Sequence, residues 1–589
     1  MSIAHEKPRD PLVPRPIDLP TPVPLDSSAE LDGLDTAKIF AAPDDPADWP
    51  AWRESLTRWR AEVAERIEYD DSAYRAREFA WTRGCFSVAL VWLWDELLYD
   101  FEAGQFTPDR FCAKSEREFG GFDGIVLWHA YPVIGIDERN QFDFYRDVPG
   151  LRGLVAAFQE RGIRVFVDYN PWDVGTRREP VADDTAIAGL VRELGADGVF
   201  LDTMKEAQPG LRAALDDVRP GIALEGESTL PLARVCDHHL SWAQWFADST
   251  VPGVLRARWF EQRHMLHHTR RWNRDHLEEL HSAWLNGVGM LVWENVFGAW
   301  VGWNDRDKEL LRAMLSVQRA HADLLATGDW TPLAAHNEDG TVVASRWRDG
   351  ETTLWAVANR GDAYAGRAGE LEVDVPAQGI AAFVGSDQVM VAGGGDTSFP
   401  AREAVRVPAP VVRVDAVPNG FAAVEPRPLT AVFRRRETGG YGEVPWVEEW
   451  KPLPPRLHAF VEVERPAPRG RFAISVREVE TGLDLAEARA YAAAAGARLP
   501  TEDEWQLAAE AGVLDLSGPR VWNWTESEHS DGRTRFAILK GGSDWEAEGS
   551  DWYVDGGPQE SSYSLKLLLL GGGLARSPWI GFRLAVDLP

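Results

Sequence analysis

Cysteine is scarce in this chain. The 589 residues include three cysteines, Cys85, Cys112 and Cys236, without regular spacing. Such a set forms neither a disulfide framework nor a zinc motif. No apolar run reaches the length of about 18 residues that a membrane-spanning helix needs, and residues 1–30 lack the apolar core of a secretory signal. These absences predict a cytoplasmic protein, and we expect no metal or cofactor.

Basic residues are also in the minority. Lys and Arg number 62 against 93 Asp and Glu, which gives a formal net charge of −31. Nucleic-acid binding depends on neutralising phosphates with basic side chains, so this balance argues against nucleic acid and against anionic membranes. It suits a small neutral substrate such as a carbohydrate. The sequence leaves open whether the chain forms a homo-oligomer.

The chain is too long for a single core, and its character changes along its length. Residues 1–35 form a Pro-rich tail, and 36–328 alternate strands and helices after a leading helix at 46–68. Residues 329–435 carry short alternating runs between turns, which predict an antiparallel β-sandwich, and 436–589 form a last unit. Nearly eight consecutive strand–helix units favour a closed (β/α)8 TIM barrel. The expected fold class is therefore multidomain α/β plus β.

The barrel strands are expected where short apolar runs occur, because parallel strands are buried on both faces. Seven strands are expected, of which the sixth is ambiguous, and no eighth is visible: 85–94, 123–131, 164–170, 198–203, 221–227, 236–246 and 287–298. Helices are expected at 107–118, 149–161, 183–194, 253–283 and 305–326, and in the last unit at 484–495 and 501–511.

Several of these apolar runs lead directly into a carboxylate. The residues concerned are Asp168, Asp202, Glu225, Glu227 and Glu294. A carboxylate inside a sheet would be desolvated at large cost, whereas the carboxyl ends of barrel strands are where catalytic residues gather. Glycoside hydrolysis needs one acid to protonate the leaving oxygen and a second to attack or to activate water. The alternative is that some of these acids are helix caps or salt-bridge partners.

Asp202 is the first candidate for a catalytic carboxylate. It ends the run Gly198-Val199-Phe200-Leu201-Asp202-Thr203 on the fourth expected strand. This strand resembles the nucleophile strand of retaining glycoside hydrolases of the α-galactosidase/α-glucosidase group. The resemblance implies that Asp202 forms a covalent glycosyl-enzyme intermediate.

Glu225 and Glu227 close the fifth expected strand. Residues two apart share a face of a strand, so both are expected at the mouth of the barrel, where repulsion would raise one pKa, as a general acid requires. We assign Glu227 as acid/base because it lies further along the strand. The families with an Asp202-type nucleophile usually carry their acid on the sixth strand, where this chain offers Asp237, so the choice stays open.

Glu294 ends the run that we count as the seventh strand. In this respect it resembles the nucleophile of the large clan of β-glycosidase barrels. The partner Asn-Glu of that clan is missing from the fourth strand, where Asp202 and Thr203 stand instead. Glu294 is therefore expected to bind ligand or to act as an alternative catalyst.

Other residues near strand ends are candidates for binding sugar. Asp168 resembles the hydroxyl-binding acid of the third strand, and carboxylates accept hydrogen bonds from hydroxyl groups well. The 27 tryptophans offer apolar faces that suit sugar rings, with ordinary core packing as the alternative for many of them. The expected substrate-binding set is Asp95, His129, Asp168, Trp172, Asp173, Glu225, Trp293 and Trp94.

Five histidines fall on the helix expected at 253–283: His264, His267, His268, His276 and His281. The i,i+4 spacing of His264 and His268 could bind a metal. No glutamate stands between them in the metalloprotease arrangement, so a solvated or ion-paired helix face is the expected role.

The last unit carries the motif Arg498-Leu499-Pro500-Thr501-Glu502-Asp503-Glu504-Trp505, in which Thr501 and Glu504 predict a capping box. Together with 521–526, 539–543 and 580–583, it resembles the formylglycine-generating-enzyme family, whose relatives include ergothioneine-pathway oxidases. The resemblance implies a C-type-lectin-like fold. The copper-binding cysteines of the family are missing, and His529 is the only histidine after residue 470, so we expect a degenerate sugar-binding or architectural module.

These features together predict a glycoside hydrolase, retaining and exo-acting on small oligosaccharides or glycosides. Three alternatives remain open. They are a transglycosylase on the same carboxylates, a metal-dependent oxidase centred on the last unit, and a non-catalytic carbohydrate-binding protein.

Overall fold

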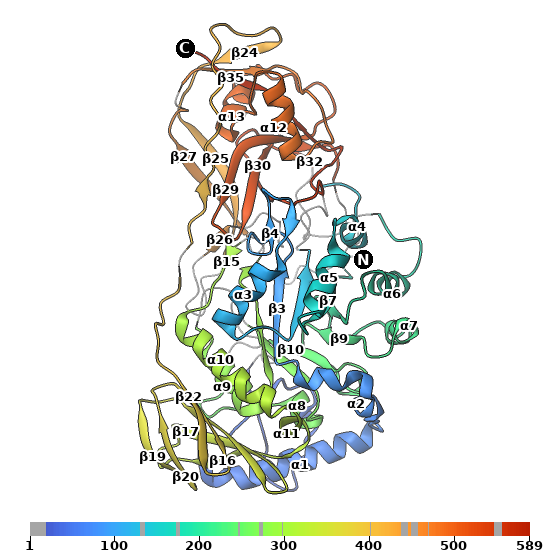
Figure 1. The fold of residues 1–589 in the computed structure, drawn as a ribbon, viewed down its shortest axis with the longest axis vertical. Coiled ribbons are helices and arrows are strands. Elements are labelled where there is room, and N and C mark those ends of the chain that lie inside the picture. The colour runs from blue at the N-terminus through green and yellow to red at the C-terminus, as the bar shows by residue number, and fades with distance from the viewer. Residues whose placement is uncertain are drawn as a thin grey trace.

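The computed structural model describes residues 19–129, 136–171, 177–244, 248–269, 275–296, 299–400, 402–437, 446–448, 458–468, 470–546 and 557–589. Figure 1 shows three bodies along the long axis of the molecule: a β-sheet unit with α1 at one end, a barrel in the middle, and a unit that contains the C-terminus at the other end. No helix among these residues has both the length and the apolarity to cross a membrane.

Eight parallel strands close into a barrel, as predicted. In chain order they are β3 (Ser87–Trp92), β6 (Gly124–Trp128), β7 (Arg164–Tyr169), β8 (Gly198–Leu201), β9 (Ala223–Gly226), β10 (Leu240–Gln244), β12 (Met265–Thr269) and β13 (Gly289–Val292). β13 pairs with β3 and completes the ring. Apart from Arg164 and Gln244 every residue of these strands is buried, which explains the apolar runs in the sequence. We call the carboxyl ends of these strands the barrel mouth.

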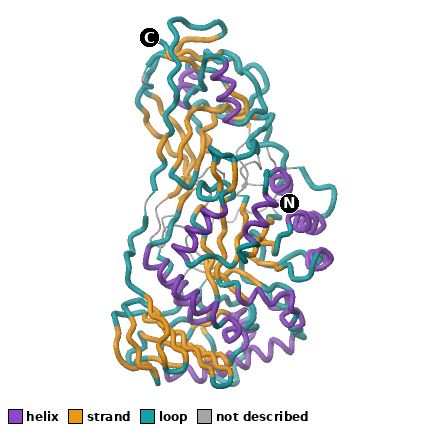
Figure 2. The backbone as a smooth tube through the Cα atoms, viewed as in Figure 1, coloured by secondary structure: helices purple, strands orange, loops and turns teal. Residues whose placement is uncertain are grey.

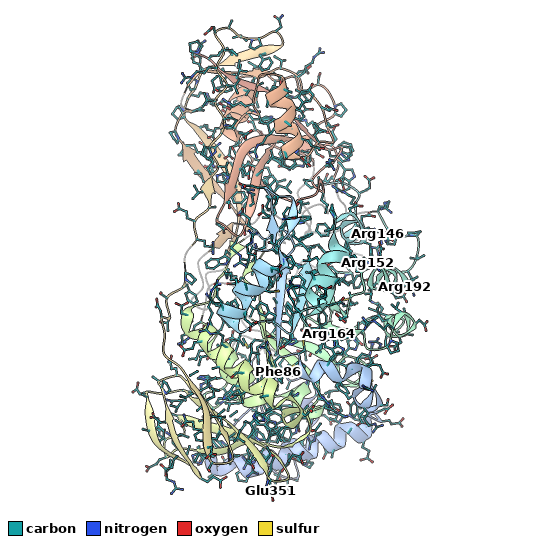
Figure 3. The ribbon with its side chains drawn as sticks, viewed as in Figure 1. Phe86, Arg146, Arg152, Arg164, Arg192 and Glu351 are labelled. Carbon is teal, nitrogen blue, oxygen red and sulfur yellow. The ribbon has the colours of Figure 1, made fainter. Side chains whose placement is uncertain are left out.

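Helices surround the strands (Figure 2). They are α2 (Ser72–Arg75), α3 (Pro108–Phe119), α4 (Gln141–Asp147), α5 (Leu151–Gln159), α6 (Asp183–Leu194), α7 (Leu211–Val218), α8 (Arg256–Phe260), α9 (Leu277–Asn286), α10 (Asp305–Ala320) and α11 (Ala322–Thr327). Short 3-10 helices occupy Asp32–Leu34, Pro46–Asp48, Arg77–Gly84 and Leu232–Arg234. The outer faces of α4, α5 and α6 carry the exposed Arg146, Arg152 and Arg192 (Figure 3).

The prediction of a single helix at 253–283 is wrong. This segment contains α8, then β12, then α9, so the seventh barrel strand was hidden inside it and the run at 287–298 supplies the eighth strand. β12 reads Met265-Leu266-His267-His268-Thr269, which has too many polar residues for the apolar pattern of the other strands. His264, His267 and His268 are accordingly buried and not on a solvated helix face.

The leading helix is confirmed as α1 (Trp49–Arg66), which buries Trp52, Leu56, Trp59 and Val63. Ahead of it, β1 (Thr21–Pro22) and β2 (Ile39–Ala41) form a small sheet with β11 (Val254–Leu255). Leu31 and Leu34 are also buried. The described part of the Pro-rich tail is therefore packed against the barrel.

The sheet unit after the barrel contains five antiparallel strands and a separate hairpin. The sheet order is β16 (Asp329–His336), β17 (Val342–Asp349), β18 (Thr352–Asn359), β21 (Ile380–Val384) and β22 (Asp387–Ala392), and the hairpin is β19 (Tyr364–Ala368) with β20 (Leu371–Val375). Trp330 stacks on Trp347 and also contacts Trp259 of α8, which joins this unit to the barrel.

The C-terminal unit, residues 402–589, consists of small sheets and two helices. Its strands are β23 (Val405–Arg406), β24 (Phe421–Val424), β25 (Leu429–Glu437), β26 (Trp446–Glu448), β27 (His458–Arg465), β28 (Phe472–Ser475), β29 (Trp522–Ser530), β30 (Arg535–Lys540), β31 (Gly542–Ser543), β32 (Gly557–Pro558), β33 (Leu565–Leu568), β34 (Ile580–Phe582) and β35 (Ala585–Asp587). β23, β24 and β25 pair with β29, β28 and β27, so residues 405–437 belong to this unit. The helices are α12 (Leu485–Ala494) and α13 (Glu502–Glu510), and the Thr501–Glu504 capping box is confirmed.

Four further two-residue strands make two small hairpins near the barrel mouth. β4 (Tyr99–Asp100) pairs with β5 (Gln105–Phe106), and β14 (Asn295–Val296) pairs with β15 (Ala299–Trp300). β4 and β15 lie beneath the C-terminal unit in Figure 1. The C-terminal unit therefore faces the barrel at its mouth.

Candidate active site at the barrel mouth

Asp202 and Glu227 lie next to each other at the mouth. They follow the neighbouring strands β8 and β9, which pair in parallel. The backbone N–H of Thr203, the residue after Asp202, donates to Oε2 of Glu227. Asn170, which follows β7, donates from Nδ2 to Oδ2 of Asp202 at 3.1 Å. Three consecutive strands thus bring two carboxylates and one amide together.

Thr203 has an unusual backbone conformation. Its φ is 63°, in the left-handed region that a β-branched residue rarely adopts. Such a conformation costs about 1–3 kcal/mol and persists where the surroundings impose it, often at functional sites. Here the left-handed turn accompanies the hydrogen bond from the Thr203 N–H to Glu227.

Asp168, the second-last residue of β7, and His129, which directly follows β6, form a second polar pair. Nε2 of His129 lies 3.1 Å from Oδ2 of Asp168, and both side chains are fully buried. Tyr145 of α4 accepts from the Asp168 backbone N–H at 2.9 Å and donates to the Leu127 carbonyl at 2.6 Å. Burial, followed by the nearby Asp168 carboxylate, raises the pKa of the Tyr145 hydroxyl, so Tyr145 remains a neutral link between the two strands.

Glu225 lies inside the barrel and does not face the mouth. Its side chain is completely buried, and Oε1 lies 2.5 Å from Nδ1 of His267 on β12. Nε2 of His267 is 2.8 Å from the Cys85 carbonyl oxygen. Burial alone would lower the pKa of His267, but the Glu225 carboxylate and this carbonyl outweigh burial and raise it. The structure therefore makes Glu225 part of the core and not a substrate ligand.

Asp237, the alternative acid, precedes β10 and so lies at the opposite end of the barrel from the mouth. Its carboxylate accepts from Nδ1 of His238 at 2.6 Å and from Arg234 at 3.0 Å. Burial acts to raise the pKa of Asp237, but the hydrogen bonds from His238 and Arg234 outweigh it and lower the pKa. Asp237 is thus an ion-pair partner away from Asp202.

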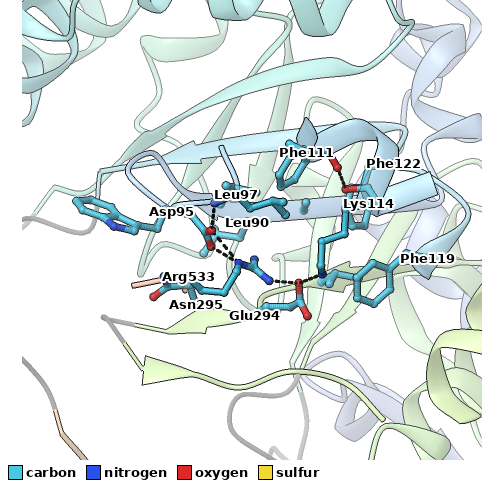
Figure 4. Close-up of a pocket in the computed structure, with 15 residues that line it drawn as sticks. Leu90, Asp95, Leu97, Phe111, Lys114, Phe119, Phe122, Glu294, Asn295 and Arg533 are labelled. Carbon is cyan, nitrogen blue, oxygen red and sulfur yellow. Dashed lines mark hydrogen bonds and ion pairs between the residues drawn. The ribbon is translucent and has the colours of Figure 1, made fainter. Parts of the chain in front are cut away.

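Glu294 and Asp95 bind an arginine of the C-terminal unit (Figure 4). Nε of Arg533 lies 2.8 and 3.0 Å from the two carboxylate oxygens of Asp95, and one terminal nitrogen lies 3.2 Å from Oε2 of Glu294. Asp95, Glu294 and Arg533 are 1%, 8% and 5% exposed. Burial acts to lower the pKa of Arg533, but the two carboxylates outweigh it and raise the pKa. This ion-paired group occupies the first-strand and eighth-strand side of the mouth.

Backbone and side-chain contacts hold the Arg533 turn, residues 530–535, in this position. The Glu96 N–H donates to the Arg533 carbonyl at 2.9 Å, and Asn295 donates from Nδ2 to the Thr534 hydroxyl at 2.9 Å. A cavity of about 20 Å³ beside Asp95, Glu294 and Arg533 is large enough for about one water molecule. The C-terminal unit therefore contributes directly to the structure of the mouth.

Tryptophans form a layer across the bore at the same end of the barrel. Trp293 meets Trp128 at a centroid distance of 5.1 Å and Trp242 at 6.3 Å. Trp242 stacks on Phe200 at 4.6 Å, two residues before Asp202. All four rings are buried. This layer is the floor of the mouth and connects the strand that carries Glu294 to the strand that carries Asp202.

The remaining expected residues lie elsewhere. Trp94 is fully buried beside Tyr99 and Phe106, and lines a separate cavity. Trp172 and Asp173 lie outside the described residues. Sequence reasoning missed Arg533, because nothing near it in the chain indicates a partner 438 residues away. It also missed Asn170, although that residue stands two positions after the expected Asp168. In the part of the chain that the structure describes, no group of three or more His, Cys, Asp or Glu could hold a metal ion.

Comparisons with known proteins give no family. No family model and no curated protein match the sequence. Solved structures that resemble part of the chain include the acarbose-soaked debranching enzyme of Nostoc punctiforme, at 11% identity and a TM-score of 0.34 over 53% of this chain and 98% of that chain. Another is the cyclic α-maltosyl-(1→6)-maltose hydrolase of Arthrobacter globiformis, at 12% identity and a TM-score of 0.32 over 51% and 99%. A third is the α-amylase of Geobacillus thermoleovorans complexed with acarbose, at 11% identity and a TM-score of 0.33 over 54% of this chain and 97% of that chain. At such TM-scores the likeness carries no inference about activity.

Proposed function

We propose that the chain is a retaining glycoside hydrolase in which Asp202 is the nucleophile and Glu227 the acid/base. The observation that carries this proposal is the hydrogen bond from the Thr203 N–H to Glu227. One peptide unit and one hydrogen bond connect the two carboxylates. Retaining enzymes need carboxyl groups about 5–5.5 Å apart and inverting enzymes about 6.5–9.5 Å apart, and so short a connection favours the retaining mechanism.

The charge pattern of the mouth supports the choice of this pair. Arg533 pairs with Asp95 and Glu294, and His267 pairs with Glu225, so those three carboxylates are committed to ion pairs. Asp202 and Glu227 accept hydrogen bonds from the Asn170 side chain and from the Thr203 backbone N–H, which fix the positions of their carboxylates.

Each residue then has a definite role. Asp202 attacks the anomeric carbon, and Glu227 gives its proton to the departing glycosidic oxygen as that bond breaks. In the second step Glu227 removes a proton from water, whose oxygen displaces Asp202 from the sugar. Asn170 orients the Asp202 carboxylate through its Nδ2 donor. The paired side chains of Asp168 and His129 are completely buried, as Glu225 is, so we assign them a supporting role beneath the mouth.

We propose small, exo-cleaved substrates and an architectural role for the C-terminal unit. The 530–535 turn of that unit occupies one side of the mouth through Arg533, which supports a mouth closed at one end. A formylglycine-generating-enzyme-like module without the catalytic cysteines would then survive as a structural part of a hydrolase site.

Release of nitrophenol from a panel of α- and β-nitrophenyl glycosides tests the proposal. Wild type should turn over at least one glycoside, and Asp202→Ala should lose about 10³-fold or more of kcat/KM. Asp217→Ala, at an exposed position on α7, is the matched control and should retain activity. An Asp202→Ala protein as active as the control would overturn the assignment, and absence of turnover on every glycoside would overturn the function.

A further inference from the structure

At the barrel mouth, α4 takes over from β6 as a hydrogen-bonding partner of β7. The register between the two strands ends at Val167 of β7. Beyond it, the Asp168 N–H donates to the Tyr145 hydroxyl at 2.9 Å. The Asn170 N–H donates to Oε1 of Gln141 at 2.8 Å. Tyr145 and Gln141 are one turn apart on α4, so two side chains on one face of a helix continue the hydrogen bonding of a strand.

Gln141 binds both polar groups of the Asn170 backbone. Besides accepting from the N–H, it donates from Nε2 to the Asn170 carbonyl oxygen at 2.6 Å. A primary amide offers a donor and an acceptor, as a peptide unit does, so one glutamine can pair with Asn170 as a neighbouring strand would. Gln141 and Asn170 are 3% and 4% exposed. Because a buried polar group is costly to leave without a partner, this pair fixes the end of β7.

Asn170 connects Gln141 to Asp202 by two routes. The peptide unit that joins Tyr169 to Asn170 donates its N–H to Gln141. The carbonyl of the same peptide unit accepts from the Asp202 N–H at 2.9 Å. In addition, Nδ2 of the Asn170 side chain donates to Oδ2 of Asp202 at 3.1 Å. Both the backbone and the carboxylate of Asp202 therefore depend on where Asn170 is held.

The start of α4, from which Gln141 projects, is held on two sides. Asn140 and Asp143 form a capping box around the first turn, so the helix begins at Gln141. Arg139, directly before the cap, donates to the backbone carbonyls of residues 574 and 576 in the C-terminal unit, at 2.7 and 3.0 Å. The cap and the C-terminal unit therefore fix the helix end that carries Gln141.

We propose that Gln141 is a positioning residue for the nucleophile and that it acts on Asp202 through Asn170. A displacement of about 1 Å between reacting groups can cost about 10²-fold in rate, so a residue that fixes the end of β7 affects the chemical step without taking part in it. The inference rests on the function proposed above, because it takes Asp202 to be the nucleophile. The hydrogen bonds that connect Gln141 to Asp202 can be tested without turnover.

The first test is Gln141→Met, which keeps the length of the side chain and removes both polar groups. On a nitrophenyl glycoside, kcat should fall about tenfold or more while KM stays within about twofold, because the variant still binds substrate but holds the nucleophile less firmly. Gln318→Met is the matched control, since Gln318 is a buried glutamine of α10 that donates to the Val288 carbonyl, at the end of the barrel away from the mouth. It should keep kcat. A Gln141→Met protein with wild-type kcat, or equal losses in the two variants, would overturn the proposal.

A double variant tests whether Gln141 acts through Asn170. Asn170→Ala removes the Nδ2 donor, and kcat should fall in this variant too. When the two changes are combined, the loss should be smaller than the product of the single losses, because both act on the same contact with Asp202. Losses that multiply fully would mean that Gln141 and Asn170 act independently, and would contradict the proposal.

Amide hydrogen exchange supplies the readout that needs no turnover. In Gln141→Met, the backbone N–H groups of Asn170 and Asp202 should both exchange about tenfold or more faster than in Gln318→Met. Unchanged exchange at Asp202 would overturn the positioning role whether or not the protein hydrolyses glycosides. If wild type hydrolyses no glycoside while both N–H groups respond, the hydrolase function fails and the coupling of Gln141 to Asp202 is supported.

Discussion

Arg533 contacts Asp95 across 438 positions of the chain, and its Nε lies 2.8 and 3.0 Å from the two carboxylate oxygens. The same guanidinium also binds Glu294. Asp95 and Glu294 follow the first and last strands of the barrel, which are neighbours in the closed ring. One arginine from a different unit therefore links the two strands where the ring closes.

Arg533→Ala should destabilise the protein strongly. It leaves Asp95 buried without its guanidinium partner and leaves Glu294 with Lys114 at 3.9 Å, and breaking a buried ion pair in this way costs about 3–5 kcal/mol. The free energy of unfolding from urea titration measures the effect. Arg367→Ala is the control, because Arg367 pairs with Glu372 on the surface and should cost about 0–1 kcal/mol. Equal losses in the two variants would contradict the structural role of Arg533.

Glu227→Ala should lose activity in a way that depends on the leaving group. General acid catalysis contributes about 10²–10⁴-fold, and an aglycone that leaves without protonation needs little of it. The variant should therefore be much closer to wild type on dinitrophenyl glycosides than on alkyl glycosides. Added azide should restore turnover, because it replaces water without needing a base. An equal loss on both substrate classes would remove Glu227 from the acid/base role.

Thr203→Gly should stabilise the protein and reduce its activity. Glycine adopts the left-handed conformation without strain, so the free energy of unfolding should rise by about 1 kcal/mol. A freer backbone would hold the N–H less firmly against Glu227, and kcat should fall more than KM changes. Glu68→Gly relieves a similar φ of 50° at the end of α1 and should leave kcat unchanged. A Thr203→Gly protein with full kcat would show that the turn does not position the carboxylates.

His267 should make stability depend on pH above neutrality. Its folded pKa is raised above 6.5, despite burial, by the Glu225 carboxylate. The stability that the protonated His267 gives to the folded protein is therefore fully present below pH 6.5, and it is lost as the pH rises through the folded pKa. Urea unfolding between about pH 6 and 9 should show declining stability in wild type and a flatter profile in Glu225→Gln. Parallel profiles would contradict the pairing.

His239 should have the opposite effect below neutrality. Burial lowers its pKa to about 3 from 6.5, so stability is complete above pH 6.5 and falls as the unfolded chain takes up protons below it. His239→Phe keeps a ring stacked on Phe79 but cannot titrate. The quantity to compare is the free energy of unfolding of the variant minus that of wild type. This difference should be larger at about pH 5 than at pH 7, by up to about 2 kcal/mol. No change in this difference between the two pH values would contradict the assignment.

Local patterns were enough to predict most of the barrel. The strands with purely apolar runs lie where they were predicted, because a strand buried on both faces needs consecutive apolar residues. The helix predicted at 183–194 is also present. Asp202 and Glu227 could be expected together, since they end consecutive strands. β12 could not be predicted from local sequence. Its polar residue His267 pairs with Glu225, which lies on another strand.

Contacts between distant parts of the chain were beyond the sequence. Asp95 and Glu294 looked like members of a sugar site because their arginine lies in another unit. Glu225 was expected at the mouth because strand alternation predicts which face of the sheet a side chain lies on. It does not predict how deep in the barrel the side chain lies. The roles of carboxylates depend on their counter-charges, and these are set by tertiary structure.

The Arg533 link also has a consequence for how the chain is made. Synthesis proceeds from the amino end, so all eight barrel strands exist before residue 533 does. Glu294 precedes the arginine by 239 positions, which at about 5–20 residues per second is an interval of roughly 10–50 s. Until then Asp95 and Glu294 lack the Arg533 guanidinium, which offsets the cost of burying them. Before Arg533 arrives, these carboxylates are therefore more stable exposed to water than buried. The ring can close early, but the mouth is finished only after residue 533 has been translated.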